Sequence, residues 1–229
     1  MKILRRGQWT CLAALWAAVS VMPGAAMAQT DQEKLVAAAE KTFDNFVRDP
    51  GMTWIQQNIG SAKGVVIAPE ILRLGFILGG SGGRAVLLSP DPKTGKWGGP
   101  AFYTLVTGSI GFQVGIDVSE VVMLVMTDKG FNSLLGGSFK FGGDVGVAAG
   151  PVGAGAKSSI LSDFVTYSRA KGIYGGLNLD GASMSSNVDW NQSYYKQPAS
   201  ATDILVRHTA TNPGAAKLLD AVAGAAAKK

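Results

Sequence analysis

Glycine is concentrated in one stretch of this chain: 26 of its 31 glycines lie between residues 60 and 181, among short runs of β-branched and aromatic residues. Glycine inside a strand loses packing contacts, but it allows bulges, sharp curvature and close backbone approach. Apolar residues alternate with small or polar ones there, most clearly at Ile110, Phe112, Val114, Ile116 and Val118. We therefore predict an α+β fold with a strongly curved, glycine-rich antiparallel sheet or a partly closed barrel.

Helices are predicted at the N- and C-terminal ends of the sheet. Thr30 and Glu33 have the spacing of a capping box, and apolar residues then recur at three- and four-residue steps over residues 31–48. Asp49 followed by Pro50 predicts the N-cap and first position of a short second helix. No polar linker divides the chain, so residues 29–229 are interpreted as a single domain with a C-terminal helical extension. Further helices are expected over residues 127–135, 187–195 and 200–206 and from residue 212 onward.

The first 28 residues have the pattern of a secretory signal peptide. Three basic residues among the first six precede an apolar run over residues 11–22, and Ala26 and Ala28 supply small residues before a cleavage site. Cleavage after Ala28 would remove Cys11, which lacks the small and apolar residues that precede an acylated cysteine. We therefore expect secretion across the inner membrane, a periplasmic or peripherally envelope-associated location, and no lipoprotein anchor.

The charge balance argues against a nucleic-acid partner. The whole chain has 21 basic and 16 acidic residues, a net charge of +5, but residues 1–28 contain three basic and no acidic residues, which leaves 18 against 16. Nucleic-acid binding requires clustered Lys and Arg, whereas these are spread singly here. With one His and one Cys in the chain, neither a metal site nor a bound cofactor is expected.

Three motifs imitate catalytic or nucleotide-binding sites, and none is complete. Residues 79–83 match G-x-S-x-G around Ser81, but a strand follows where a helix is required and the only His is His208. A glycine-rich hairpin with a turn at residues 82–83 is the preferred interpretation. Residues 150–158 imitate a P-loop, but Ala156 separates the last Gly from its Lys. Asp117 and Glu120 are interpreted as solvated charges beside a hairpin, so no catalytic residue is predicted.

Candidate lipid-binding residues lie mainly on the first predicted helix. Lys34, Lys41 and Arg48 recur every seven residues and form one basic stripe beside the apolar face, an arrangement that can lie on a membrane surface. Phe43, Phe46 and Trp54 either complete the core or enter lipid, and these alternatives remain open at this point. The other candidate phosphate contacts are Lys63 after the helices and Arg73, Arg84 and Lys171 near glycine-rich turns.

One resemblance rests on seven segments taken in order: residues 63–67, 79–83, 97–102, 111–115, 142–144, 149–153 and 167–176. Together they resemble the SYLF domain of bacterial envelope proteins and eukaryotic membrane and actin regulators. The resemblance covers about residues 30–197 and implies a non-enzymatic domain that binds phosphoinositides and other anionic phospholipids and, in eukaryotic members, actin filaments. It also implies that residues 31–48 form the lipid-binding helix.

The sequence thus predicts a secreted lipid- or phospholipid-binding module that acts at a membrane surface of the cell envelope. The expected partner is an anionic phospholipid or membrane surface. The alternative is an envelope structural or protein-interaction module without intrinsic lipid binding, which would have an envelope protein as its partner. Actin is not an expected partner for a secreted protein of bacterial type.

Overall fold

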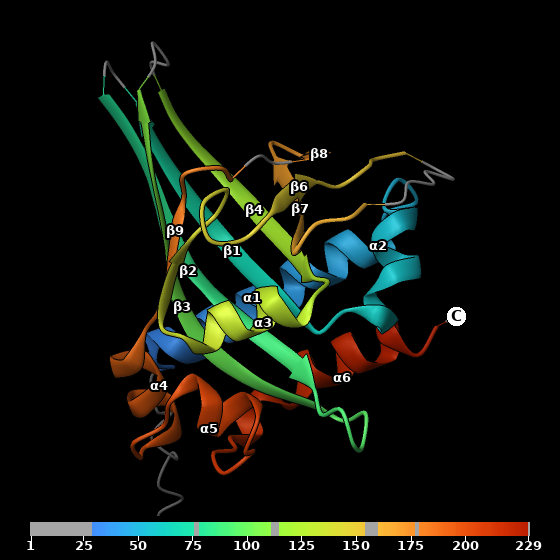
Figure 1. Cartoon of the computed structure of the whole chain (residues 1–229), viewed down its shortest axis with the longest axis vertical. Helices are drawn as coiled ribbons and strands as arrows, with labels where there is room; N and C mark the ends of the chain where they lie inside the picture. Colours follow the sequence, from blue (N-terminus) through green and yellow to red (C-terminus); the bar gives the residue numbers. More distant parts are fainter. Residues whose placement is uncertain (1–28, 76–77, 111–114, 154–159, 177–178, 229) are drawn as a thin grey trace, which may run out of the picture.

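Four long strands form the centre of one curved sheet in the computed structural model, which describes residues 29–75, 78–110, 115–153, 160–176 and 179–228 (Figure 1). β1 pairs with both β2 and β4, and β2 pairs with β3, all in antiparallel orientation. The β2–β3 connection contains a turn in which the Gly95 amide donates to the Asp91 carbonyl. The bounds of the four strands are β1 (Gly64–Gly75), β2 (Leu78–Pro90), β3 (Trp97–Ile110) and β4 (Gly115–Val125).

Shorter strands extend the sheet on both sides. The order across it is β5-β9-β3-β2-β1-β4-β7-β6, and β8 also pairs with β7. β6 is parallel to β7, which corrects the expectation of a purely antiparallel sheet. The predicted fold class is otherwise confirmed, because the sheet curls into a half-barrel with helices from both ends of the chain (Figure 1). The shorter strands are β5 (Ser138–Lys140), β6 (Val147–Ala149), β7 (Phe164–Ala170), β8 (Ile173–Gly176) and β9 (Ser183–Ser186).

The helices follow the predicted boundaries except at the second one. α1 (Asp31–Arg48) begins with the predicted capping box, in which Thr30 and Glu33 exchange hydrogen bonds between side chain and backbone. The Asp49 carboxylate accepts from the Gly51 amide and forms a turn, so the second helix starts later than predicted. The remaining elements are α2 (Thr53–Asn58), η1 (Ile59–Ser61), α3 (Asp128–Leu135), α4 (Val188–Tyr195), α5 (Ala201–Leu205), η2 (Pro213–Ala215) and α6 (Ala216–Ala226).

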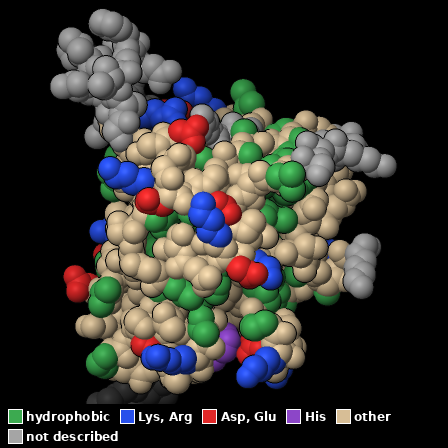
Figure 2. Space-filling view, viewed as in Figure 1, with side chains coloured by type: hydrophobic (Ala, Val, Ile, Leu, Met, Phe, Trp, Pro, Cys, Tyr) green, Lys and Arg blue, Asp and Glu red, His purple; other side chains and the backbone are tan. Residues whose placement is uncertain are grey.

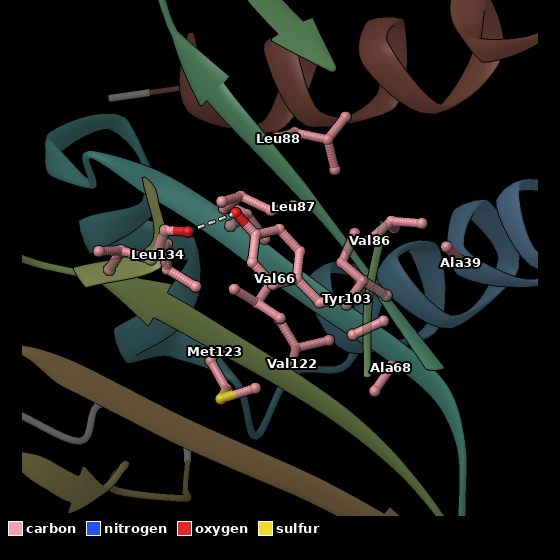
Figure 3. Packing of buried hydrophobic residues seen from close by; sticks show 14 of the residues in the cluster. Ala39, Val66, Ala68, Val86, Leu87, Leu88, Tyr103, Val122, Met123 and Leu134 are labelled. Carbon is pink, nitrogen blue, oxygen red and sulfur yellow. Dashed lines mark hydrogen bonds between the residues drawn. The ribbon is translucent and has the colours of Figure 1, made fainter. Parts of the chain in front are cut away.

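Two adjacent residues of β3 show how helices cover both faces of the sheet. The Phe102 ring packs edge-on against Trp190 and Tyr194 of α4, with centroid distances of 5.8 and 5.1 Å. The Tyr103 hydroxyl instead donates to the Leu134 carbonyl in α3 over 2.8 Å (Figure 3). Successive strand residues point to opposite faces, so α3 lies on one side and α4 on the other. α1 and α6 lie on the side opposite α3 (Figure 1).

The glycine-rich segment at residues 79–83 lies inside β2, so the prediction of a hairpin turn at residues 82–83 is wrong. Gly83 pairs with Ile71 on β1. A Cβ at this glycine would lie 2.1 Å from the carbonyl oxygen of Glu70, close to the point where the register of β1 shifts. The glycine therefore accommodates an irregularity in the neighbouring strand, which local turn patterns do not reveal.

The alternating run at residues 110–118 belongs to two strands. Ile110 ends β3 and Gly115 begins β4, while Phe112 and Val114 lie outside the described residues. Both strands have a period of two, and their apolar residues happen to stay in phase along the sequence. The alternation alone therefore did not show that β3 and β4 are separate strands. Asp117 and Glu120 both lie within β4.

Candidate functional site

The four central strands extend beyond the helices (Figure 1). One face of these strands has a row of exposed apolar residues. The strand register places Val118, Leu72, Gly82 and Val106 opposite one another across β4, β1, β2 and β3. Directly paired residues point to the same face. Val118, Leu72 and Val106 are 47%, 36% and 53% exposed. These four residues are called the apolar row. It lies on the face covered by α4, because Val106 has the same parity on β3 as Phe102.

A groove of about 430 Å³ lies beside the apolar row, where the first half of α1 approaches β1, β2 and α4. Leu72 and Gly82 of the apolar row line it, and Leu35 and Trp190 contribute apolar surface from the two helices. This α1–sheet groove therefore continues the exposed apolar surface toward the body of the protein. The remaining lining residues are Asp31, Lys34, Ala38, Pro69, Glu70, Gly83 and Arg84.

Four of the residues that line the α1–sheet groove are charged. Lys34 Nζ lies 3.0 Å from the Asp31 carboxylate. The guanidinium carbon of Arg84 lies 4.2 Å from the centroid of the Trp190 ring, a cation–π contact. Glu70 is directly opposite Arg84 in the β1–β2 register, yet the structure shows no ion pair between these two described residues. The groove thus has two cations and two carboxylates around apolar surface.

The predicted cations are only partly brought together. Of the seven, Lys34 and Arg84 share the α1–sheet groove, although they are far apart in the sequence. Arg73 lies next to Leu72 on β1 and so faces the other side of the sheet, opposite Asp117 of β4. Lys171 is exposed in the β7–β8 turn with a φ of 50°.

The other two residues of the predicted basic stripe, Lys41 and Arg48, lie outside the α1–sheet groove. Lys41 and Arg48 line an open groove of about 600 Å³ along α1, together with Glu40 and Asp44. Arg48 Nη2 is 2.7 Å from the Asp44 carboxylate. The acidic residues therefore offset much of the positive charge of the stripe. Acidic and basic side chains are also interspersed on the opposite face, over α3 (Figure 2).

Lys63 is also placed away from the α1–sheet groove. It precedes β1, and its Nζ lies 3.1 Å from the carboxylate of Asp128 at the start of α3. Both side chains are substantially exposed, so the pair contributes little to stability. Because this lysine already has a neighbouring carboxylate, its attraction for a phosphate is reduced.

The three aromatic candidates lie in the core. Phe43 and Phe46 are fully buried, and Trp54 is 5% exposed. The Phe46 ring packs edge-on against Tyr174, with centroids 5.1 Å apart, and the Trp54 ring lies 6.3 Å from that of Tyr167. Of the two alternatives for these side chains, the structure adopts packing in the core, because the curled sheet provides aromatic partners that residues 31–59 alone do not reveal.

The catalytic-site imitations are not assembled into sites within the described part of the chain. Ser81 is buried inside β2 and not on a strand-to-helix turn. His208 lies near the β2–β3 turn, with Nε2 3.5 Å from the Asp91 carboxylate. Lys157 and Ser158 of the P-loop-like segment are outside the described residues.

Neither a metal centre nor a membrane-spanning helix is found in the described residues. No group of three or more His, Cys, Asp or Glu side chains there has the arrangement needed to hold a metal ion. None of the helices in the same residues combines the length and the apolar character required to cross a bilayer.

Sequence reasoning missed the apolar row and two residues of the α1–sheet groove, Glu70 and Trp190. Leu72, Val106 and Val118 have the same alternation as core residues, so nothing in their local pattern indicates exposure. Glu70 and Trp190 are separated by 120 positions in the sequence and line the same groove only because α4 packs against α1 and β3. The one sequence feature that marks the apolar row is Gly82, because a glycine in the middle of a strand leaves the row without a side chain at that position.

Comparison with known proteins identifies similar sequences. A family model described as "Las17-binding protein actin regulator" (Ysc84) matches residues 106–225, which is just over half of the chain. The bovine SH3 domain-containing YSC84-like protein 1 is 30% identical over 152 residues, covering 64% of this chain and 44% of that protein. Protein YSC84 of Saccharomyces cerevisiae is 27% identical over 165 residues, covering 69% of this chain and 35% of that protein.

A second yeast relative gives a similar result. The LAS seventeen-binding protein 3 of Saccharomyces cerevisiae strain YJM789 is 29% identical over 153 residues, covering 63% of this chain and 32% of that protein. The chain thus spans less than half the length of these curated relatives.

Proposed function

The chain belongs to the Ysc84 family, whose common module is the SYLF domain, and from this premise we propose that it binds phospholipid at a membrane surface of the cell envelope. The observation that supports this function best is the exposed apolar row beside the α1–sheet groove. Exposed apolar surface at the projecting end of a sheet is typical of an interaction site. The site proposed here is therefore the apolar row together with the α1–sheet groove, and Lys34 is the only residue of the basic stripe that belongs to it.

Apolar contact supplies part of the binding free energy in this proposal. Transfer of a half-exposed Val or Leu side chain from water to hydrocarbon contributes on the order of 1 kcal/mol. Val118, Leu72 and Val106 together would support weak, reversible attachment. Trp190 at the wall of the groove suits the polar–apolar boundary of a bilayer, where aromatic residues with a polar group are favoured.

Polar contact comes from the two cations of the α1–sheet groove. Arg84 presents a planar guanidinium that can bind phosphate oxygens in a bidentate manner, and Lys34 adds a second positive charge. Each cation has a carboxylate close by, so the groove does not create a strong positive field. We therefore expect apolar contact to contribute more to the affinity than electrostatic attraction does, so the affinity should change little with ionic strength.

Vesicle flotation with an apolar-row variant tests the proposal. Leu72→Thr, Val106→Thr and Val118→Thr combined keep strand-compatible side chains but remove exposed apolar surface. Ile173→Thr is the control, because Ile173 is 75% exposed and its register through Ala170 to Ser119 places it on the face of the sheet opposite the row. We expect the chain and the control to float with phospholipid vesicles and the triple variant to stay in solution. Equal flotation of all three, or of none, contradicts the proposal.

The proposed function also includes export of the protein from the cytoplasm. We infer that residues 1–28 act as a signal peptide and that the protein works in the periplasm or at the envelope without catalysing a reaction. The basic and apolar pattern of those residues supports export, although they lie outside the described structure. N-terminal sequencing of the protein from the periplasmic fraction would identify Gln29 as the first residue. An intact N-terminus on cytoplasmic protein is the opposite result.

A protein-binding function is the second candidate. One yeast relative is named LAS seventeen-binding protein 3, and the family model is described as "Las17-binding protein actin regulator", so relatives of this chain are named for protein partners. The same apolar row could contact an envelope protein. Crosslinking in intact cells separates the two functions: recovery of one defined protein, together with failure of the purified chain to bind vesicles, favours the protein-binding function.

A further inference from the structure

The charges of the α1–sheet groove indicate which class of headgroup it accepts. Resting on the proposed phospholipid-binding function, we propose that the groove binds the zwitterionic headgroup of an ethanolamine phospholipid, with phosphate at Arg84 and the primary ammonium at Glu70. The sequence predicts an anionic phospholipid as partner; the charges of the groove favour a zwitterionic one.

The balance of charge is the first observation. Lys34 and Arg84 supply two positive charges, and Asp31 and Glu70 supply two negative charges, so the groove has no net charge. An anionic headgroup would be attracted by the cations and repelled by the carboxylates at similar distances. A zwitterionic headgroup has one negative and one positive charge, so it can bind a cation and a carboxylate of the groove at the same time.

The second observation is that Glu70 and Arg84, both within the described part of the chain, are neighbours in the sheet but do not form an ion pair. They are Cα partners in the β1–β2 register, where opposing Cβ atoms are about 4.5–5.5 Å apart, close enough for an ion pair. The Arg84 guanidinium instead lies over the Trp190 ring, and no ion pair joins it to Glu70 among the described side chains. A cation and a carboxylate thus stand side by side at the groove without neutralising each other, which leaves both available to opposite charges of one ligand.

The chemistry of the ammonium group selects ethanolamine over choline. A primary ammonium has three N–H donors and can donate to the Glu70 carboxylate. A quaternary ammonium has none and is recognised chiefly through open aromatic faces. The Trp190 face that would serve this purpose already carries Arg84. The groove volume of about 430 Å³ has room for a headgroup of this size beside the apolar wall.

Direct binding measurements test the headgroup class. The purified chain is titrated with phosphatidylcholine vesicles that contain phosphatidylethanolamine, phosphatidylglycerol or neither. The soluble compounds glycerophosphoethanolamine, glycerophosphocholine and glycerol phosphate are then titrated while the Trp190 indole N–H signal is followed by NMR. The soluble series removes effects of bilayer curvature. We expect the strongest response to the ethanolamine compound in both series.

Two variants assign the charges of the headgroup to residues. Glu70→Gln should weaken binding of the ethanolamine compound roughly three- to tenfold and bring it close to glycerophosphocholine, because the ammonium then donates to a neutral amide oxygen and no longer to a charged carboxylate. Arg84→Gln should weaken all three soluble phosphates. Glu40→Gln and Lys96→Gln, outside the groove, are the matched controls and should leave the preference unchanged. Circular dichroism and urea unfolding verify that every variant is folded.

The outcomes separate the headgroup from the function. A preference for phosphatidylglycerol over phosphatidylethanolamine overturns the zwitterion proposal and leaves phospholipid binding in place. An ethanolamine preference that survives Glu70→Gln also overturns it, because the ammonium would then bind elsewhere. Absence of binding to every vesicle contradicts the proposed function itself.

Discussion

Arg169 on β7 donates a hydrogen bond to the carboxylate of Glu120 on β4, and this ion pair anchors the first helix to the sheet. The second carboxylate oxygen of Glu120 accepts from the Thr42 hydroxyl of α1 over 3.1 Å. The Tyr174 hydroxyl, 3.5 Å from the guanidinium of Arg169, donates to the Asn45 carbonyl over 3.0 Å. The position of α1, and therefore one wall of the α1–sheet groove, depends on this network.

Loss of the Arg169–Glu120 pair should lower stability measurably. Burial alone would lower the pKa of Arg169, but the charge and hydrogen bond of Glu120 raise it, so the guanidinium stays charged at every accessible pH. Arg169→Met leaves Glu120 partly buried without its cation and should reduce the free energy of unfolding by about 1–3 kcal/mol. Arg48→Met removes a more exposed pair on α1 and should cost about 0.5 kcal/mol or less. Urea unfolding measures both; equal losses would show that the network does not anchor α1.

Acid should weaken the cap of α5 through Asp203. Hydrogen bonds from the Ser200 hydroxyl and amide, followed by one from Arg207, lower the pKa of Asp203 from 3.8 to about 2. A lowered pKa stabilises the folded state above the unfolded value and loses that effect as pH falls through the folded value. Asp203→Asn should therefore be less stable than the parent chain at neutral pH, with the difference shrinking between about pH 4 and pH 2. Thermal unfolding across this range follows it, and a difference independent of pH would contradict the assignment.

Glycines 83 and 80 should respond oppositely to the same substitution. A Cβ at Gly83 would lie 2.1 Å from the Glu70 carbonyl oxygen, whereas the nearest atom to a Cβ at Gly80 is 3.5 Å away. Gly83→Ala forces backbone displacement and should cost about 1–3 kcal/mol. Gly80→Ala should be neutral or slightly stabilising, because alanine restricts the unfolded chain more than glycine does. Denaturant midpoints of the two variants test this, and an inert Gly83→Ala would refute the close contact.

Replacement of Phe43 should lower the stability of the fold, because its ring is buried in the core. Its ring is fully buried against the core, so Phe43→Ala should reduce the free energy of unfolding by about 3–5 kcal/mol. Val106→Ser, at the most exposed position of the apolar row, should change stability by only about 0.5 kcal/mol. Urea unfolding of both variants provides the comparison. Similar stability of the two would place Phe43 outside the core and reopen the alternative in which it enters lipid.

Local patterns predicted the helices well because each start has its own chemical marker. The capping box at Thr30 and Glu33 forms as predicted, and the side chains of Thr127, Asn187 and Ser200 also accept backbone hydrogen bonds at the starts of α3, α4 and α5. The exception follows from the same chemistry, since Asp49 uses its carboxylate to form a turn and not a cap.

The candidate site was much less accessible to sequence reasoning. Lys34 and Arg84 were both singled out, but for different reasons and as members of different groups. Their proximity depends on α1 crossing β1 and β2, a contact between segments 50 positions apart. The aromatic rings of α1 could equally have served core or membrane, because an apolar helix face has the same period in both environments.

The sequence by itself determined the class of fold, the helix starts, the near-neutral charge after residue 28 and the family, because these depend on composition, short-range hydrogen bonds and the order of motifs. Only the tertiary structure decided which apolar residues are exposed and which cations have carboxylate neighbours. Phe43 and Leu72 show the reason: both are apolar residues in regular elements, and only the packing of other segments covers the first and leaves the second open to solvent.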